Sequence, residues 1–116
     1  MKGYYQLIEG HRGEFKFVLR AGNHETILES GLYWSRIAAM DAVDTVRRCS
    51  QDLNLYRRTD CPDGQFGFEL LDESGKVLGR SPGCSTRSGV NAGIASVQRN
   101  AVATAFRGLV RQALTA

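Results

Sequence analysis

Apolar and polar residues alternate along two segments that lie 51 residues apart in the chain. Residues 14–19 read Glu-Phe-Lys-Phe-Val-Leu and residues 65–70 read Gln-Phe-Gly-Phe-Glu-Leu, so two phenylalanines and a leucine occupy every second position in each. This alternation predicts a strand with one buried face. We expect the opposite face to be solvated, as antiparallel sheets allow. The polar side chains on that face are Glu14, Lys16, Arg20, Gln65 and Glu69.

The apolar spacing changes to that of a helix after each strand region. One stripe recurs at intervals of four, three and four residues, and a matching stripe precedes it by 51 residues. The stripes consist of Val90, Ile94, Val97 and Ala101, and of Ala39, Val43, Val46 and Ser50. Ser35 and Thr86 stand where helix N-caps are expected. We predict that both helices lie on the phenylalanine face of the sheet.

The chain repeats itself at the same spacing. Positions 4–50 align with positions 55–101 without a gap, and nine of these 47 pairs are identical, where about three identities would arise by chance. Glycine-containing turn sequences separate the predicted strands at corresponding places in both copies. Each copy therefore reads as a three-stranded antiparallel meander followed by a helix.

These patterns predict an α+β fold built as a tandem βββα repeat. One helix covers only part of a three-stranded sheet, so a single copy could not bury enough apolar surface. We expect a two-layer sandwich, with a six-stranded antiparallel sheet and two helices on one face plus a C-terminal helix. The predicted single domain spans residues 1–116. It comprises repeat one at 3–51, repeat two at 54–102 and a C-terminal helical extension at 103–116.

The predicted C-terminal helix rests on an apolar stripe of its own, formed by Val102, Phe106, Leu109 and Ala113. We favour packing of this helix against the rest of the chain, because large exposed apolar stripes are uncommon on monomers. The alternative is that Phe106 and Leu109 face a partner, including a second copy of the chain in a homodimer through the C-terminal helix.

The composition is that of a folded globular protein, with 42% hydrophobic and 23% charged residues in 116. The sequence shows no signal-peptide pattern and no apolar run of membrane-spanning length, so we expect a cytoplasmic protein without a membrane partner. Cys49, Cys61 and Cys84 are odd in number and form no CxxC pair. We therefore expect free thiols in a reducing compartment, and neither a metal site nor a cofactor.

Arginine accounts for most of the positive charge, and four arginines bracket the junction between the two copies: Arg47, Arg48, Arg57 and Arg58. Arginine reads phosphate groups well, so this cluster is a candidate site for a small anion or a nucleic acid. We favour a cluster that is solvated and paired within the chain, because Asp44 and Asp52 can pair with Arg47 and Arg48 near the end of the first helix. Two thirds of the net charge of +3 also lies in residues 103–116, so the repeated body is close to neutral, which argues against a broad phosphate-binding face.

The remaining candidates are two histidines and an aromatic pair. His11 and His24 fall in predicted hairpin loops, so we interpret them as solvated polar residues rather than as a general acid and base. Gly10 and Gly13 around His11 are better explained by the turn than by an anion-binding nest. Tyr33 and Trp34 precede the first helix, and we interpret them as a staple that holds the helix on the sheet; the alternative is an exposed stacking platform.

The two copies resemble the YegP-like family of small duplicated bacterial proteins. Residues 15–19 and 66–70 match its Phe-x-Phe-x-Leu strand, residues 30–35 match its serine and tyrosine segment, and residues 93–101 match its helix motif. The resemblance implies the two-layer fold and no established biochemical function, so it assigns no site residue. The chain departs from the family pattern at Cys84, where a tyrosine is expected, and at Pro82-Gly83 just before it.

The sequence contains no catalytic signature. We therefore expect a non-enzymatic interaction or accessory protein of unknown partner. The alternative is an anion- or nucleic-acid-binding module centred on the four arginines, with an enzyme in third place.

Overall fold

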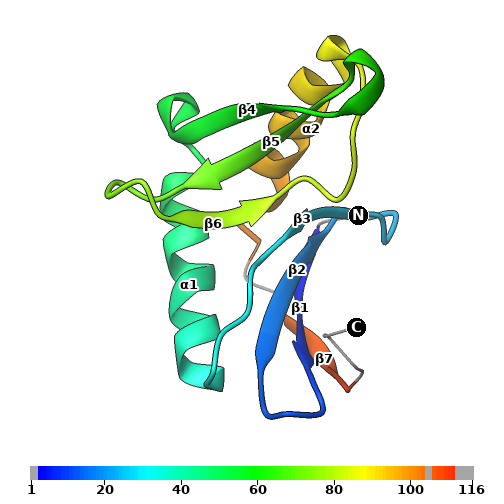
Figure 1. Ribbon diagram of the computed structural model, residues 1–116. Coiled ribbons are helices and arrows are strands. Elements are labelled where there is room, and N and C mark those ends of the chain that lie inside the picture. Colours follow the sequence, from blue (N-terminus) through cyan, green and yellow to red (C-terminus); the bar gives the residue numbers. More distant parts are fainter. Residues whose placement is uncertain (1–2, 104–105, 112–116) are drawn as a thin grey trace.

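The computed structural model describes residues 3–103 and 106–111, which form two successive βββα units and one further strand (Figure 1). The first unit comprises β1 (Tyr4–Glu9), β2 (Phe15–Arg20), β3 (Thr26–Glu29) and α1 (Arg36–Cys49). The second comprises β4 (Tyr56–Asp60), β5 (Phe66–Leu71), β6 (Val77–Arg80) and α2 (Arg87–Asn100). Strand β7 (Phe106–Arg111) follows, and 3-10 turns occupy Leu53–Leu55 and Pro62–Gly64.

The strands form one seven-stranded sheet in the order β4-β5-β6-β3-β2-β1-β7. Each unit contributes an antiparallel meander, and the two meanders meet where β3 pairs with β6 through Glu29 and Arg80. Strand β7 adds to the free edge of β1 in the parallel direction. The α+β class is therefore confirmed, whereas the expected six-stranded antiparallel sheet is wrong, because the sheet is mixed and has a seventh strand.

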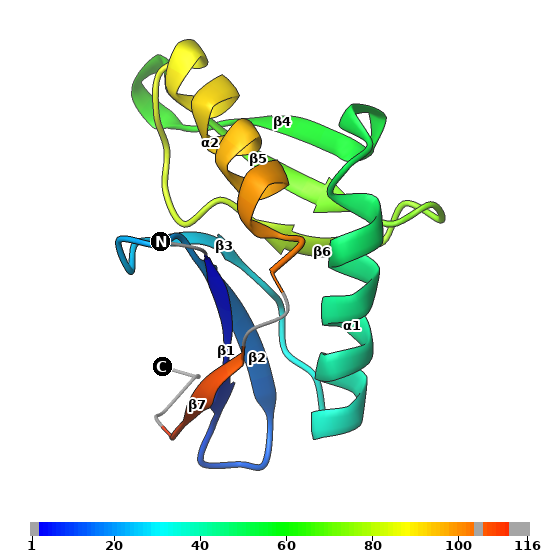
Figure 2. The same ribbon diagram turned by 180° about the vertical axis from the view of Figure 1, so that it is seen from behind.

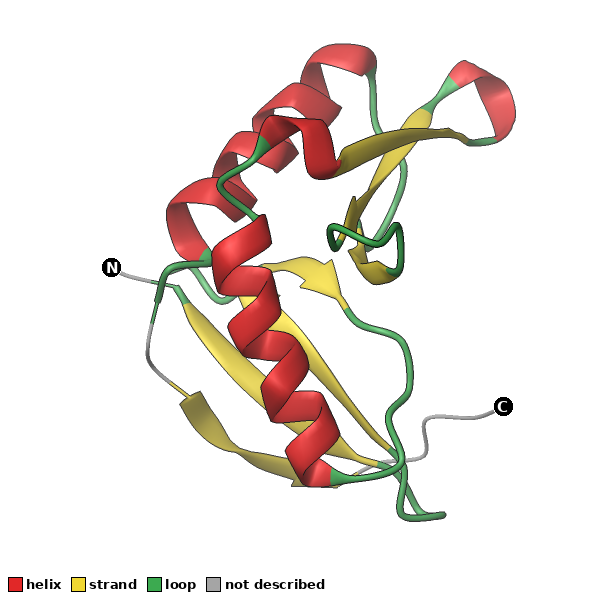
Figure 3. Cartoon of the chain, turned by 90° about the vertical axis from the view of Figure 1, so that its left-hand side faces the viewer, coloured by secondary structure: helices red, strands yellow, loops and turns green. Residues whose placement is uncertain are grey.

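Both helices pack on the same face of the sheet, and each contacts strands of both units (Figures 2 and 3). Helix α1 lies against β2, β5 and β6, and helix α2 lies against β2, β3 and β5. One buried cluster joins Phe17 and Leu19 of β2 to Phe68 and Leu70 of β5. The two Phe-x-Phe-x-Leu segments therefore line a shared interior, as the alternation predicts.

The helices begin and face the core as expected. Ser35 Oγ accepts a hydrogen bond from Ala38 N (3.0 Å), and Thr86 Oγ1 accepts one from Gly89 N (3.1 Å). All eight residues of the two predicted stripes are buried. Local capping and an apolar stripe are enough to specify these helices.

Two tyrosines tie each helix to the other unit. The hydroxyl of Tyr5 on β1 donates to the carbonyl of Ala101, the residue that ends α2 (2.5 Å). The hydroxyl of Tyr56 donates to the carbonyl of Ser50, which ends α1 (2.9 Å). Each bond satisfies a carbonyl that the helix itself leaves free, so the two units interlock reciprocally.

The C-terminal helix is replaced by strand β7, which corrects the expected helical extension and any homodimer built through it. Phe106 and Leu109 lie in register with Tyr5 and Leu7 of β1. Gly108 adopts a positive φ of 58°, beside a shift in register, and glycine is a poor residue for a helix interior. Ala113 of the predicted stripe lies outside the described residues.

The outer face of the sheet is also less solvated than expected. Gln65 is exposed, but Glu14 and Glu69 are buried, with 1% and 7% of their surface exposed. Glu14 bends back over Gly10, where one carboxylate oxygen accepts a hydrogen bond from Arg12 N (3.0 Å). Hydrogen bonds from Arg57 and Arg80 make the burial of Glu69 tolerable, because they replace water around the charge. The other carboxylate oxygen of Glu14, Oε2, is buried without a hydrogen-bond partner among the described residues. None of the helices that the structure describes is long and apolar enough to cross a membrane.

Candidate functional site

The four arginines of the predicted anion site have partners on different elements. Arg47 Nη1 pairs with Asp44 (2.7 Å), and both Nε and Nη2 of Arg48 donate to Glu73 in the β5–β6 turn (3.1 Å each). These bonds from Arg48 hold the pKa of Glu73 at about 2. Asp44 therefore pairs with Arg47 rather than with Arg48, four residues after it, and Arg48 binds Glu73 instead.

Arg57 and Arg58 point to opposite faces of edge strand β4, as neighbouring strand residues must. Arg57 Nε donates to Glu69 on the outer face (3.0 Å), and Glu69 also accepts from Arg80 Nε (2.7 Å). Arg58 donates to the side-chain oxygen of Asn91 on α2. The structure thus distributes the four guanidinium groups over separate partners rather than gathering them around one centre.

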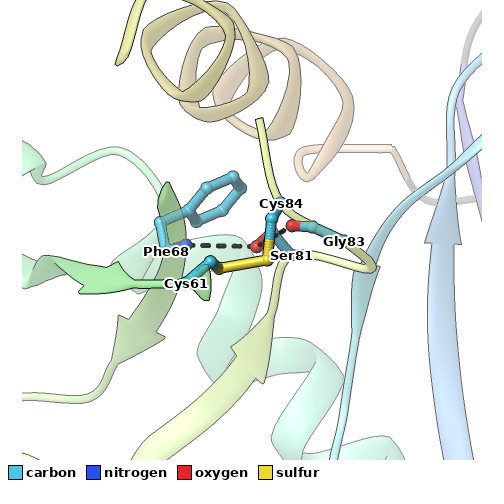
Figure 4. Close-up of a disulfide and its surroundings, with 5 residues drawn as sticks. All are labelled: Cys61, Phe68, Ser81, Gly83 and Cys84. Atoms are coloured by element: carbon cyan, nitrogen blue, oxygen red, sulfur yellow. Dashed lines mark hydrogen bonds between the residues drawn. A yellow bond between two sulfur atoms is a disulfide. The ribbon is translucent and has the colours of Figure 1, made fainter. Parts of the chain in front are cut away.

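A disulfide joins Cys61, after β4, to Cys84, in the loop before α2, with their Cα atoms 6.3 Å apart (Figure 4). The expectation of three free thiols is therefore wrong for this pair, and Cys49 alone is free. The spacing of 23 residues says nothing about proximity, whereas the fold brings the β4–β5 turn beside the β6–α2 loop. Cys84 is exposed and Cys61 is half-buried.

Two open hollows flank this disulfide. The larger, of about 450 Å³, lies between the β6–α2 loop and the start of α2, and the smaller, of about 290 Å³, is lined by both cysteines. Ser81, Gly83 and Cys84 line both of them. The loop and its disulfide therefore form the wall between the two hollows.

A group of exposed apolar side chains lies at the start of α1. Trp34 and Ile37 have 70% and 74% of their surface exposed, and Leu32 and Met40 are exposed as well. We call these four residues the apolar surface. Ile37 and Met40 are one helical turn apart, so they share a face of α1.

The expected aromatic staple is correct for Tyr33 and wrong for Trp34. The ring of Tyr33 stacks on Phe17 of the core, with centroids 6.2 Å apart. Trp34 lies between Tyr33, which pairs with Phe15, and the N-cap Ser35. Because most of its surface is exposed, its side chain points away from the sheet.

The second unit lacks an equivalent apolar surface. Ser88 and Asn91 stand 51 residues after Ile37 and Met40. In the second unit the bridging residue, Ser85, is followed directly by the N-cap Thr86, so Trp34 has no counterpart. The apolar surface is therefore not a requirement of the βββα unit.

The two histidines lie in different hairpin turns of the first unit. His24 occupies the β2–β3 turn at a positive φ of 70°, and its Nδ1 lies 2.8 Å from the hydroxyl of Tyr4. His11 is exposed in the β1–β2 turn. Within residues 3–103 and 106–111, no three His, Cys, Asp or Glu side chains gather as metal ligands do.

Comparison with known proteins identifies the family. The model of a domain of unknown function, DUF1508, matches the chain twice, at residues 11–56 and 62–106. The chain belongs to the UPF0339 (YegP-like) family. Its similarity to YegP of Escherichia coli is 36% identity over 100 residues, which cover 86% of this chain and 91% of YegP. This confirms the resemblance read from the strand and helix motifs.

Other UPF0339 proteins agree in sequence and fold. The Bordetella pertussis protein is 37% identical over 101 residues, covering 87% of this chain and 90% of that protein. The solution structure of the Shewanella oneidensis UPF0339 protein superposes with a TM-score of 0.87 at 31% identity, covering 96% of this chain and 93% of that one. That of E. coli YegP gives 0.84 at 31% identity, covering 100% and 97%.

UPF0339 membership brings a fold and no activity, so the candidate sites rest on this chain's own residues. Sequence reasoning missed the disulfide, because the spacing of Cys61 and Cys84 along the chain gives no signal that their two loops lie side by side. It gave an exposed aromatic platform that included Trp34 only as the alternative, and it missed Leu32, Ile37 and Met40 of the apolar surface. The signal for that surface was the contrast between Ile37 and Ser88 at equivalent positions.

Proposed function

We propose that this UPF0339 protein is a non-enzymatic interaction protein that binds another protein through its apolar surface. The observation that carries the proposal is the exposure of Trp34 and Ile37 in the first unit alone. Tryptophan, methionine and isoleucine lose water favourably on contact, and tryptophan is among the residues that contribute most to protein interfaces.

The size of the apolar surface indicates the kind of partner. A standard interface buries roughly 800 Å² on each protein, and four side chains from one short stretch supply less than that. We therefore infer a transient partner that presents a small apolar ridge, such as one face of an amphipathic helix. A second copy of the chain would need a larger area for a stable dimer.

The test uses a photo-activated cross-linker placed at Met40, so that only a protein seated on the apolar surface is captured. The expected result is one partner band from a cell extract, retained in Ser88→Asp and lost in Ile37→Asp. Ser88 is the equivalent position in the second unit, which makes it a matched control for added charge. Equal capture by the two variants would contradict the proposal.

Trp34 then provides a direct measurement with the purified partner. It is the only tryptophan of the chain, so its fluorescence reports on this surface alone. Binding should shift its emission to shorter wavelength, because the indole leaves water. Light scattering of the chain alone distinguishes a partner protein from a second copy of the chain. A concentration-dependent dimer that Ile37→Asp abolishes would show that a second copy, and not another protein, binds the apolar surface.

The anion- or nucleic-acid-binding alternative rests on Arg58. Its partner in the structure is a neutral amide, and edge strand β4 leaves its side chain exposed. Arg58→Glu should then abolish a salt-dependent mobility shift of RNA at low salt. An unchanged shift, or none with the unaltered protein, removes this alternative.

A further inference from the structure

The loop that carries Cys84 is held to the sheet by hydrogen bonds that do not involve the disulfide. Phe66 and Ser85 exchange two backbone bonds of 2.8 Å each. Ser81 Oγ accepts a hydrogen bond from Phe68 N and donates one to the carbonyl of Gly83, both at 3.1 Å (Figure 4). These bonds fix the loop on both sides of Cys84.

The first unit builds the same junction without cysteines. Phe15 and Tyr33 exchange two backbone bonds of 2.7 Å, and Ser30 Oγ accepts from Phe17 N (2.9 Å) and donates to the carbonyl of Gly31 (2.8 Å). Gly10 stands where the second unit has Cys61. The disulfide is therefore an addition to a junction that forms without it, and its removal should leave the fold in place.

The two sulfur atoms differ in accessibility. Cys84 is exposed in its loop, whereas Cys61 is half-buried beside the start of β5. The smaller hollow, of about 290 Å³, is lined by both residues and is open to solvent. A small thiol can therefore approach Cys84 Sγ from outside, with Cys61 as the leaving group. Exposed disulfides are the labile ones in proteins.

The remaining cysteine does not compete for this chemistry. Cys49 is 1% exposed, and its thiol donates to a carboxylate oxygen of Glu73 (3.4 Å). Burial raises the pKa of this thiol, with a further contribution from Glu73. A buried thiol with a raised pKa is a poor nucleophile.

We propose that the Cys61–Cys84 disulfide is a reversible thiol-exchange site that a low-molecular-mass thiol attacks at Cys84. The attacking thiolate forms a sulfur–sulfur bond with Cys84 Sγ, the bond to Cys61 breaks, and Cys61 leaves as a thiolate that takes a proton from water. A second thiolate then attacks the external sulfur of the mixed disulfide and releases Cys84. In total the protein gains two electrons and two protons, and two thiols become one small-molecule disulfide.

The experiment incubates the oxidised, folded protein with reduced glutathione at neutral pH, followed by alkylation and mass measurement. We expect two alkyl groups, on Cys61 and Cys84, with Cys49 unmodified until the protein is denatured. A transient adduct of one glutathione should map to Cys84, and the far-UV circular dichroism should stay unchanged. Reduction only in denaturant, an adduct on Cys61, or loss of the dichroism on reduction would each overturn the proposal.

Two single variants test the direction of attack. Cys61→Ser leaves the exposed thiol and Cys84→Ser leaves the half-buried one, and both lack the disulfide. Oxidised glutathione should modify the exposed thiol of Cys61→Ser at least about tenfold faster than the half-buried thiol of Cys84→Ser, because access governs the exchange rate. Equal rates, or faster reaction of Cys84→Ser, would show that Cys84 is not the preferred sulfur.

Discussion

At the scale of single residues, Glu69 shows how a polar position on a strand becomes buried. Its carboxylate lies between Arg57 and Arg80, its direct partners on the neighbouring strands β4 and β6, so side chains from three successive strands meet on the outer face. The hydrogen bonds from Arg80 and Arg57 lower the pKa of Glu69. The alternation within β5 predicts the outward direction of Glu69, but its two partners depend on how the strands are arranged.

Glu69→Gln should reduce the free energy of unfolding by about 1 kcal/mol at pH 7. Because the pKa of Glu69 is lower in the folded state than in the unfolded state, its stabilisation is complete above the ordinary glutamate pKa of about 4.3 and is lost as the pH falls through the folded value. Urea midpoints at pH 7 and pH 3 measure this, and the gap between the variant and the unaltered protein should narrow at pH 3. A gap that stays constant would contradict the assignment.

Tyr5 and Tyr56 act as equivalent residues in the two units. Replacing either with phenylalanine leaves a helix-terminal carbonyl without its partner, so each change should lower the free energy of unfolding by about 1–2 kcal/mol. Tyr33→Phe is the control, since the bonds to the terminal carbonyls of the two helices come from Tyr5 and Tyr56. Urea unfolding should then show Tyr33→Phe close to the unaltered protein, and equal losses in all three variants would count against the capping role.

The same tyrosines predict an alkaline limit to stability. Burial raises the pKa of Tyr5 and of Tyr56 above the ordinary value. A raised folded pKa means that their stabilisation is complete below the unfolded value of about 10 and is lost as the pH rises above it. A Tyr5→Phe and Tyr56→Phe double variant should therefore lose less stability than the unaltered protein between pH 9 and pH 11.

At the scale of elements, the contact between β3 and β6 joins the two meanders. A Cβ atom on Gly79 would lie 2.8 Å from Cγ of Leu28 and 3.1 Å from the carbonyl oxygen of Glu29. Gly79→Ala should therefore cost about 1–3 kcal/mol of unfolding free energy, as overpacking does. Gly31→Ala, where a Cβ would meet no atom within 4 Å, is the matched control. Thermal unfolding of the two variants distinguishes them, and equal midpoints would refute a tight junction.

The elements also show where sequence patterns succeed and where they fail. The stripes and N-caps of α1 and α2 are encoded within fourteen consecutive residues and their immediate flanks, so they were predicted correctly. The stripe of Val102, Phe106 and Leu109 has helical spacing too, yet Phe106–Arg111 form a strand, because β1 offers an unpaired edge. The local feature that disfavours a helix here is Gly108, because glycine has a low helix propensity.

At the scale of the whole molecule, the disulfide closes a loop of 23 residues within the second unit. Cross-linking restricts the unfolded chain, which for a loop of this length corresponds to about 3 kcal/mol. The Cys61→Ser and Cys84→Ser double variant should have a free energy of unfolding about 3 kcal/mol lower and therefore a lower urea midpoint, and it should still unfold cooperatively. An unchanged midpoint would mean that the cross-link does not constrain the unfolded chain.

The sequence by itself determined which face of β2, β5 and the two helices lies on the core, where the helices begin, and the order of elements in both units. These features follow from the period of apolar residues and from capping over a few neighbouring positions. Tertiary structure decided the pairing of Cys61 with Cys84, the place of Glu69 between two arginines, the reciprocal bonds of Tyr5 and Tyr56, and the parallel strand β7. These contacts depend on which strands and loops lie side by side and in which register, and the pattern within one element carries no information about its neighbour.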